Sequence, residues 1–192
     1  MTSATELIEQ FIGLQKKLSP DQLKELDKHI LAETGHLKFV PNPGPQTAAY
    51  YTLADEVYYG GAAGPGKTAL LCGLPLNEHF DIQLFRREGT QLRGLVKELS
   101  KFIGSTQGFN SQLGIWRLPS GQTIELAGVK DEDDKEKWQG RAADYKGFDE
   151  ITSFTRSQYR FIVGWNRSTR PHKRCRVVAT GNPPMTAEGL WI

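Results

Sequence analysis

The segment GGAAGPGKT at residues 60–68 constrains the fold of this chain more than any other stretch. Residues 61–68 fit the spacing G-x-x-x-x-G-K-T. Such glycines let backbone N–H groups turn inward around a phosphate, and a helix that begins at the lysine adds the positive end of its dipole. An ordinary turn is the alternative. A strand expected at 56–60 and a helix expected from residue 66 favour phosphate binding, because they place the loop where that chemistry needs it.

The predicted nucleotide-contacting positions of this loop are consecutive. They are Gly61, Ala62, Ala63, Gly64, Pro65, Gly66, Lys67 and Thr68. The Lys67 ammonium is expected to reach the β- and γ-phosphate oxygens, and the Thr68 hydroxyl is expected to be a ligand of Mg²⁺.

Strands and helices are expected to alternate along the rest of the chain. Helices are expected at 46–54, 90–103 and 155–165, and strands at 81–87 and 175–180. This order predicts an α/β fold with a mainly parallel central sheet flanked by helices. Residues 114–129 alternate apolar and polar residues on both sides of PSGQ, which predicts an inserted β-hairpin. The charged run KDEDDKEKWQG after it is expected to be exposed.

The first 37 residues predict a separate helical hairpin. Apolar residues recur at helical spacing over 4–17, and Ser19, Pro20 and Gln22 form a start signal for a second helix. The proline-rich connector FVPNPGP follows, so we expect domains at 1–37 and 38–192.

Composition excludes several classes of protein. A chain of 192 residues with 38% hydrophobic residues can bury a core, and its net charge of +2 predicts no broadly basic surface. Two cysteines, Cys72 and Cys175, predict neither a disulfide framework nor a zinc ribbon. No apolar run approaches the roughly 20 residues of a membrane span, and the N-terminus lacks a signal-peptide pattern, which predicts a cytosolic chain without membrane contact.

The stretch DYKGFDEITSF predicts a second functional site. Asp149 and Glu150 follow a short strand, and both carboxylates are expected to face the ligand crevice. One can hold Mg²⁺ through water, and the other can orient the water that attacks the γ-phosphate. A solvated helix cap is the alternative.

Two further segments complete the candidate site. The strand in RVVATGNPP leads into Thr180 and Asn182, whose small polar groups can sense a γ-phosphate, although Asn before Pro is also common in turns. No guanine-selecting N-K-x-D stretch occurs, and the Gln46 amide can pair with adenine. These features favour ATP, with a solvated Gln46 at a helix start as the alternative.

Taken together, the motifs resemble a known family over roughly residues 38–185. They are PGPQ, GGAAGPGKT, SGQTIEL, WQGRAADYKGFDE and RCRVVATGNPP, in this order. This set resembles the ATPase domain of a bacteriophage large terminase, a P-loop NTPase of the ASCE type. The resemblance implies an ATP hydrolase that moves double-stranded DNA into a procapsid in the host cytoplasm.

The resemblance also implies roles for single residues. Lys67 and Thr68 would act on phosphates and Mg²⁺, Asp149 on Mg²⁺, and Glu150 as the catalytic carboxylate. Gln46 would bind adenine, and Thr180 and Asn182 would couple hydrolysis to movement. An arginine from a neighbouring subunit would complete the site. Arg141 is the candidate for that arginine, with Arg86, Arg87 and Arg117 as other possibilities and a salt bridge to the DEDD run as its structural alternative.

Partners follow from the same resemblance. It implies a homo-oligomeric ring, a pentamer by family, that works with a portal protein and a small terminase subunit. The family's nuclease domain is expected to be missing, since the chain stops at Ile192. The segment WNRSTRPHKRCR offers a loop for sequence-independent contacts with the DNA backbone, or simply a solvated loop. Its basic residues are Arg167, Arg170, Lys173, Arg174 and Arg176.

Three other functions share parts of this pattern. A helicase-like DNA or RNA motor has the same phosphate loop and acid pair, but should unwind duplexes. In a nucleotide-dependent assembly module, ATP binding would fix a ring contact and turnover would be incidental. A small-molecule kinase fits less well, because the sequence offers no evident acceptor site.

Overall fold

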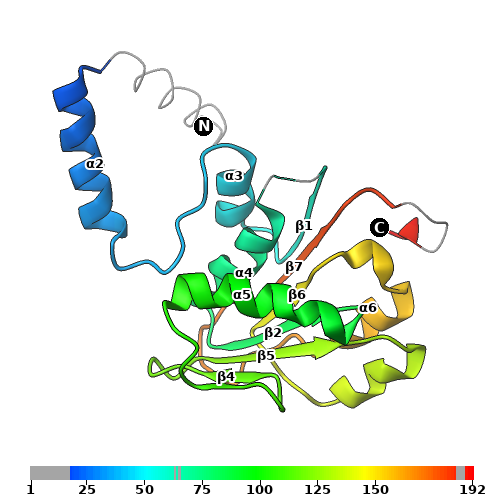
Figure 1. Ribbon diagram of the computed structural model, residues 1–192. Helices are drawn as coiled ribbons and strands as arrows, with labels where there is room; N and C mark the ends of the chain where they lie inside the picture. The colour runs from blue at the N-terminus through cyan, green and yellow to red at the C-terminus, as the bar shows by residue number, and fades with distance from the viewer. Residues whose placement is uncertain (1–17, 63, 65, 185–188) are drawn as a thin grey trace.

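The computed structural model describes residues 18–62, 64, 66–184 and 189–192 (Figure 1). Its first element is helix α2 (Pro20–Thr34). The backbone N–H of Gln22 donates to the Ser19 hydroxyl at 3.3 Å, and the backbone N–H of Ser19 donates to the Gln22 side chain at 2.9 Å. This reciprocal pair confirms the predicted helix start. The first helix predicted for the hairpin, at 4–17, lies outside the described residues.

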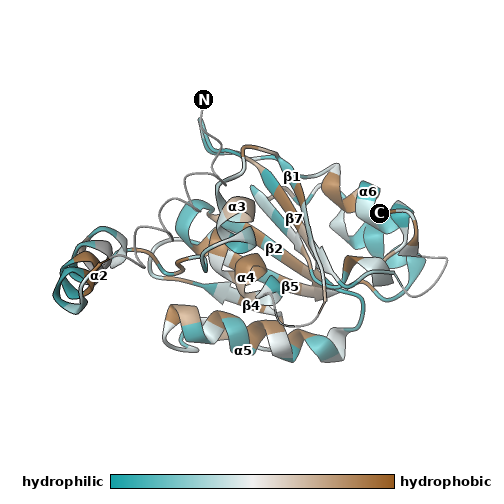
Figure 2. Cartoon of the chain, turned by 90° about the horizontal axis from the view of Figure 1, so that it is seen from above, coloured by the Kyte–Doolittle hydropathy of each residue, from teal (hydrophilic) through white to brown (hydrophobic). Residues whose placement is uncertain are grey.

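Helix α2 lies to one side of the sheet in both views (Figures 1 and 2). The domain boundary near residue 38 stays a prediction. No helix within the described ranges combines the length and the apolar character that crossing a bilayer requires.

In the described part of the chain, the strands form one seven-stranded sheet in the order β1-β7-β6-β2-β5-β4-β3. Strands β1, β7, β6, β2 and β5 pair in parallel, whereas β4 and β3 continue the sheet antiparallel. This arrangement confirms the predicted α/β class. The bounds are β1 (Glu56–Gly60), β2 (Asp81–Arg86), β3 (Phe109–Asn110), β4 (Ile115–Arg117), β5 (Thr123–Gly128), β6 (Tyr145–Phe148) and β7 (Arg176–Gly181).

Helices cover both faces of the sheet, as Figure 2 shows from above. One face packs against α4 (Lys67–Glu78) and α5 (Leu92–Ile103), with the short η1 (Gly89–Gln91) before α5 and α3 (Pro45–Tyr51) beside α4. The opposite face packs against η2 (Glu132–Trp138), η3 (Ile151–Ser153) and α6 (Arg156–Val163). Each face has its own apolar cluster, so burial of both faces holds the helices on the sheet.

Two segments differ from their predicted form. The hairpin is part of the central sheet, because its second strand β5 pairs with β4 on one side and in parallel with β2 on the other. The charged run folds into η2, capped by Asp131, and buries Trp138 edge-on against Phe85 with ring centroids 4.6 Å apart. One aromatic residue therefore anchors a segment whose charged side chains remain at the surface.

The position of β7 decides which residues can meet. It comes last along the chain but lies between β1 and β6. Adjacent strands lie about 4.8 Å apart, so the chain that leaves β1 and the chain that leaves β6 are separated by roughly 10 Å. The carboxyl ends of parallel strands share one edge of the sheet. The loop after β1 and the residues after β6 and β7 therefore share that edge.

Candidate active site

The loop between β1 and α4 has the backbone that its glycines predict. Gly61, Gly64 and Gly66 have φ angles of 136°, 110° and 70°. Gly66 is the N-cap of α4 in the left-handed region, and no side chain caps this helix end. The first N–H groups of a twelve-residue helix therefore face the loop, which is the geometry of an anion site. The predicted contact residues Ala63 and Pro65 lie outside the described residues.

Lys67 turns its side chain back over this loop. It is 8% exposed, and its Nζ donates to the carbonyl oxygens of Gly61 and Ala62 at 2.8 Å each. A third hydrogen bond runs to Asn182 Oδ1 at 3.0 Å. An ammonium group has three donors, so all three are used. The lysine is thus held at the loop by neutral oxygens that phosphate oxygens can replace.

Asp149 is the most buried acid of the site. It is 1% exposed, and its Oδ1 accepts from the Thr180 hydroxyl at 2.8 Å. Its Oδ2 accepts from Arg86 Nε at 2.7 Å and lies 2.6 Å from Arg86 Nη2. The carboxylate is therefore neutralised by an arginine at the end of β2 and positioned by a hydroxyl on β7. The solvated-cap alternative does not apply to Asp149, because solvent does not reach it.

Glu150 adopts a backbone conformation that is rare for a residue with a side chain. Its φ and ψ angles are 56° and 55°, in the left-handed region. Its Oε2 accepts a long 3.5 Å hydrogen bond from the backbone N–H of Asn182. Unlike Asp149, Glu150 is only half-buried. The two acids therefore differ in exposure, although the sequence predicted that both face the ligand crevice. Strained backbone of this kind is concentrated at functional sites.

The end of β7 connects the other parts of the site. Thr180 contacts Asp149, while Asn182 contacts both Lys67 and Glu150. The structure therefore brings together the predicted residues of three separate motifs. The turn interpretation of Asn182 accounts for neither its hydrogen bond to Lys67 nor its contact with Glu150.

Gln46 lies in the first turn of α3 and is 2% exposed. Its Nε2 donates to the Gly66 carbonyl at 2.9 Å, and its Oε1 accepts from the backbone N–H of Asn42 at 2.5 Å. The solvated alternative is therefore wrong. Both ends of the amide are used within the chain, so pairing with adenine, which stays a prediction, would require the amide to exchange these partners.

Arg141 lies on the α6 face of the sheet. Its guanidinium forms an ion pair with Glu125 of β5 and stacks over Trp138 at 4.6 Å. Its salt-bridge partner is therefore not in the DEDD run. The role across a subunit interface stays a prediction. Of the other arginines considered, Arg86 contacts the acid pair, and Arg87 donates to Gln158 at 2.6 Å instead. Arg117 lies in β4, near the far end of the sheet order.

The basic segment lies at the opposite edge of the sheet, before β7. Arg167 and Arg170 are exposed, and Arg170 stacks over Phe80 at 4.4 Å. Lys173 donates to the Glu78 carbonyl at 3.1 Å, and Arg174 donates to the Ala54 carbonyl at 2.6 Å. DNA contact by these residues stays a prediction.

The prediction that all five basic residues of this segment lie on an accessible loop is wrong for Arg176. This residue is fully buried as the first residue of β7, so it is not a loop residue that DNA can reach.

The pairing of Arg86 with Asp149 is the contact that sequence reasoning missed. The sequence signal was an arginine pair directly after the apolar part of β2, in LFRR. Only the strand order shows that this end of β2 lies beside β6 and hence beside Asp149.

The residues present suit a magnesium ion bound together with phosphates. Among the described residues, no three His, Cys, Asp or Glu side chains form a metal cage. Mg²⁺ is usually bound by one or two protein oxygens, substrate phosphates and water. Thr68, at the second position of α4, and Asp149 Oδ1, which keeps one lone pair, provide such a set.

No protein-family model matches this chain, and no curated protein matches it. Among solved structures, the large terminase from the thermophilic bacteriophage D6E matches with a TM-score of 0.49 and 18% sequence identity. The match covers 67% of this chain and 34% of that chain, so this chain spans about a third of that protein's length. The function of this chain therefore has to follow from its own residues.

Proposed function

We propose that this chain is an ATP hydrolase whose nucleotide lies at the carboxyl edge of the sheet, over the loop at 61–68. One observation carries the proposal. Asn182 contacts both Lys67 of the phosphate loop and Glu150 of the acid pair, so β7 links two motifs that are 83 residues apart in the sequence. Neither an ordinary turn nor a surface helix cap needs such a link.

The chain's own residues supply the chemistry. Lys67 would exchange its carbonyl partners for phosphate oxygens, because its ammonium is attracted more strongly to a negatively charged oxygen than to a neutral one. Thr68 and Asp149 would hold Mg²⁺, which when bound supplies neutralising charge to the phosphates. Glu150, less buried than Asp149, would orient the attacking water and accept its proton. Arg86 pairs with the Asp149 carboxylate and holds it in place.

ATP is the proposed substrate, because the sequence has no N-K-x-D stretch for selecting guanine. We further propose a motor function of the large-terminase type, on the order of the sequence motifs. Its proposed setting is a homo-oligomeric ring, a pentamer by family, on a procapsid in the host cytoplasm. Double-stranded DNA, a portal protein and a small terminase subunit are its proposed partners. The β7 end would couple the site to movement, because Thr180 contacts Asp149, and Asn182 contacts both Lys67 and Glu150.

Steady-state ATP hydrolysis against protein concentration tests this proposal. The variants are Glu150→Ala, Arg141→Ala and an equimolar mixture of the two. Arg156→Ala is the control, as an exposed arginine at the start of α6. A ring motor predicts a rate per subunit that rises with concentration, two inactive variants and recovery in the mixture, with the control unchanged.

Three outcomes would contradict the proposal in whole or in part. A rate that neither depends on concentration nor recovers on mixing would remove Arg141 from the site and favour a self-contained ATPase. Separation of duplex strands during hydrolysis would favour the helicase-like motor over a packaging motor. Absence of hydrolysis in the wild type at all concentrations, with DNA present, would contradict the enzymatic function itself.

A further inference from the structure

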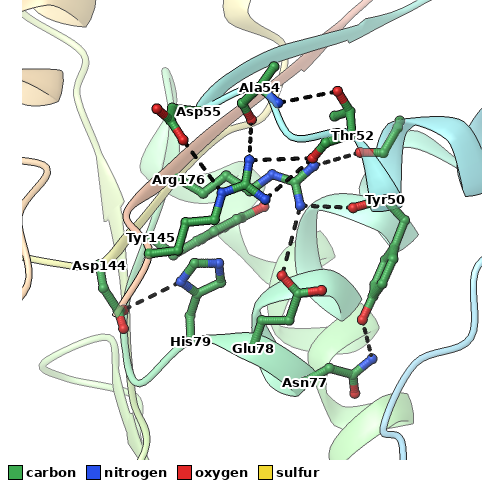
Figure 3. A network of polar contacts seen from close by, with 12 residues as sticks. Tyr50, Thr52, Ala54, Asp55, Asn77, Glu78, His79, Asp144, Tyr145 and Arg176 are labelled. Atoms are coloured by element: carbon green, nitrogen blue, oxygen red, sulfur yellow. Dashed lines mark hydrogen bonds and ion pairs between the residues drawn. The ribbon is translucent and has the colours of Figure 1, made fainter. Parts of the chain in front are cut away.

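Helix α3 is fixed at its carboxyl end by a buried arginine. Arg176 has no exposed surface, and its Nη2 and Nη1 donate to the carbonyl oxygens of Ala49 and Tyr50 at 2.7 and 2.9 Å (Figure 3). These carbonyls belong to the last turn of α3, where a cation also complements the helix dipole. Glu78, at the end of α4, lies 3.9 Å from the same guanidinium. The start of β7 thus holds the end of α3.

The amino end of the same helix is fixed to the phosphate loop. Gln46 donates to the Gly66 carbonyl, the oxygen that also accepts the first hydrogen bond of α4 from Leu70. The approach is close, because a Cβ placed on Gly66 would lie 2.5 Å from the Gln46 Nε2. Glycine at this position therefore serves both the left-handed backbone and the contact with Gln46.

Helix α3 cannot set its own position. It has seven residues, and its N-cap Gly44 makes no side-chain capping hydrogen bond. Isolated helices shorter than about 12 residues are marginal in water, so contacts with the rest of the fold, including the packing of Tyr50 in the core, decide where such a helix lies. At the carboxyl end, the described contacts include Arg176 of β7 and Asn77 of α4, which donates to the Tyr50 hydroxyl at 3.0 Å; at the amino end, Gln46 reaches the phosphate loop.

We propose that α3 is a strut that sets the phosphate loop, with Gln46 and Arg176 as its positioning residues. This inference rests on the proposed function of the loop. It gives Gln46 a role toward the phosphates of any nucleotide and not toward the adenine base. It also means that both ends of β7 act on the site, one through Thr180 and Asn182 and the other through Arg176 and α3.

Binding of three ligands to the Gln46→Leu variant separates the two roles of Gln46. The ligands are ATP, GTP and inorganic triphosphate, each with Mg²⁺, measured by isothermal titration calorimetry. Gln46→Leu removes two hydrogen bonds, one with Asn42 and one with Gly66 of the loop. Loss of the neutral hydrogen bond to the loop predicts a drop in affinity of about fivefold. The strut predicts the same fold-loss for all three ligands, because the loop binds what they share.

Gln122→Leu is the matched control. The Gln122 amide also donates to backbone carbonyls, those of Leu76 and His79 at 3.0 and 2.7 Å, but at the far end of α4. This variant should lose stability and keep the wild-type affinity for all three ligands. An equal affinity loss in Gln122→Leu would mean that any loss of stability weakens binding, and would overturn the strut.

Arg176→Met tests the other end of α3. If it folds by circular dichroism, it should show the same base-independent loss, and the double variant with Gln46→Leu should lose no more than the larger single loss. Fully additive losses would overturn the link through α3. If Arg176→Met does not fold, the Gln46 comparison decides alone.

The remaining outcomes are also distinct. A loss confined to ATP in Gln46→Leu would assign the residue to adenine, and unchanged affinity for all ligands would remove it from the site. Either result overturns the strut and leaves the proposed function standing. A wild-type protein that binds none of the three ligands overturns both.

Discussion

Removal of the Arg86 side-chain charge should destabilise the folded chain, because it leaves a buried carboxylate with a hydroxyl as its remaining side-chain partner. The Asp149 side chain is 2% exposed and the Arg86 side chain 20% exposed, so water contributes little to the solvation of the Asp149 charge. Breaking a buried ion pair by removing one partner typically costs about 3–5 kcal/mol. For a chain of this length, that corresponds to a fall in melting temperature of roughly 6–20 °C.

The variant Arg86→Met keeps most of the side-chain volume, so the loss reports the charge and not a cavity. Urea denaturation followed by tryptophan fluorescence measures the free energy of unfolding. Arg86→Met/Asp149→Asn is the matched variant, because asparagine removes the orphaned charge and keeps an oxygen for the Thr180 hydroxyl. It should recover most of the lost stability. A loss below about 1 kcal/mol in Arg86→Met would match an exposed ion pair and refute the reasoning. Absence of recovery in the double variant would refute it too.

Two further predictions concern hydrolysis and acid stability. Glu150→Gln should slow ATP hydrolysis by about 10²–10⁴-fold and leave the affinity for Mg·ATP within about twofold of the wild type, since a general base acts in the reaction and not in binding. Phosphate release measures the rate, and calorimetry measures the affinity. An equal loss in rate and affinity would contradict this role. Burial, with the nearby Arg176, lowers the pKa of His79 to about 3 from an ordinary 6.5. Between these values the unfolded chain binds a proton that the folded chain does not, so stability should fall as the pH falls from 6.5 toward 3, by up to about 1.4 kcal/mol per pH unit. His79→Phe should flatten this dependence in urea denaturation at pH 4 to 7 relative to the wild type, and an unchanged slope would contradict it.

Local patterns predicted most of the fold. The strand predicted at 56–60 is β1 residue for residue, and the strand predicted at 81–87 is β2 within one residue. These elements follow from short-range features, such as apolar runs bounded by glycine and proline, that the chain carries within a few residues. The β5 strand was predicted as one half of a hairpin, and its parallel partner β2 could not be inferred from that alternation.

The contacts within the site follow from the order of the strands in the sheet, which local sequence patterns do not show. Arg86 reaches Asp149 because β2 neighbours β6, and Asn182 reaches Lys67 because β7 lies beside β1. Spacing along the chain does not fix strand order. Charge was also a poor guide to exposure, since Arg176 in a basic segment is buried against helix carbonyls. A buried arginine needs partners from elsewhere in the fold, and no local pattern announces them.

The most direct test of the central claim is calorimetric binding of Mg·ATP to the wild type and to Lys67→Ala. Two of the lysine's three hydrogen bonds go to carbonyl oxygens of the loop, which phosphate oxygens would replace, and a hydrogen bond to a charged group contributes about 1.5–3 kcal/mol. A phosphate site at 61–68 therefore predicts binding by the wild type and a loss of at least about tenfold in the variant. Equal affinity in the two proteins, or no binding by either, would contradict the assignment of this loop as the nucleotide site.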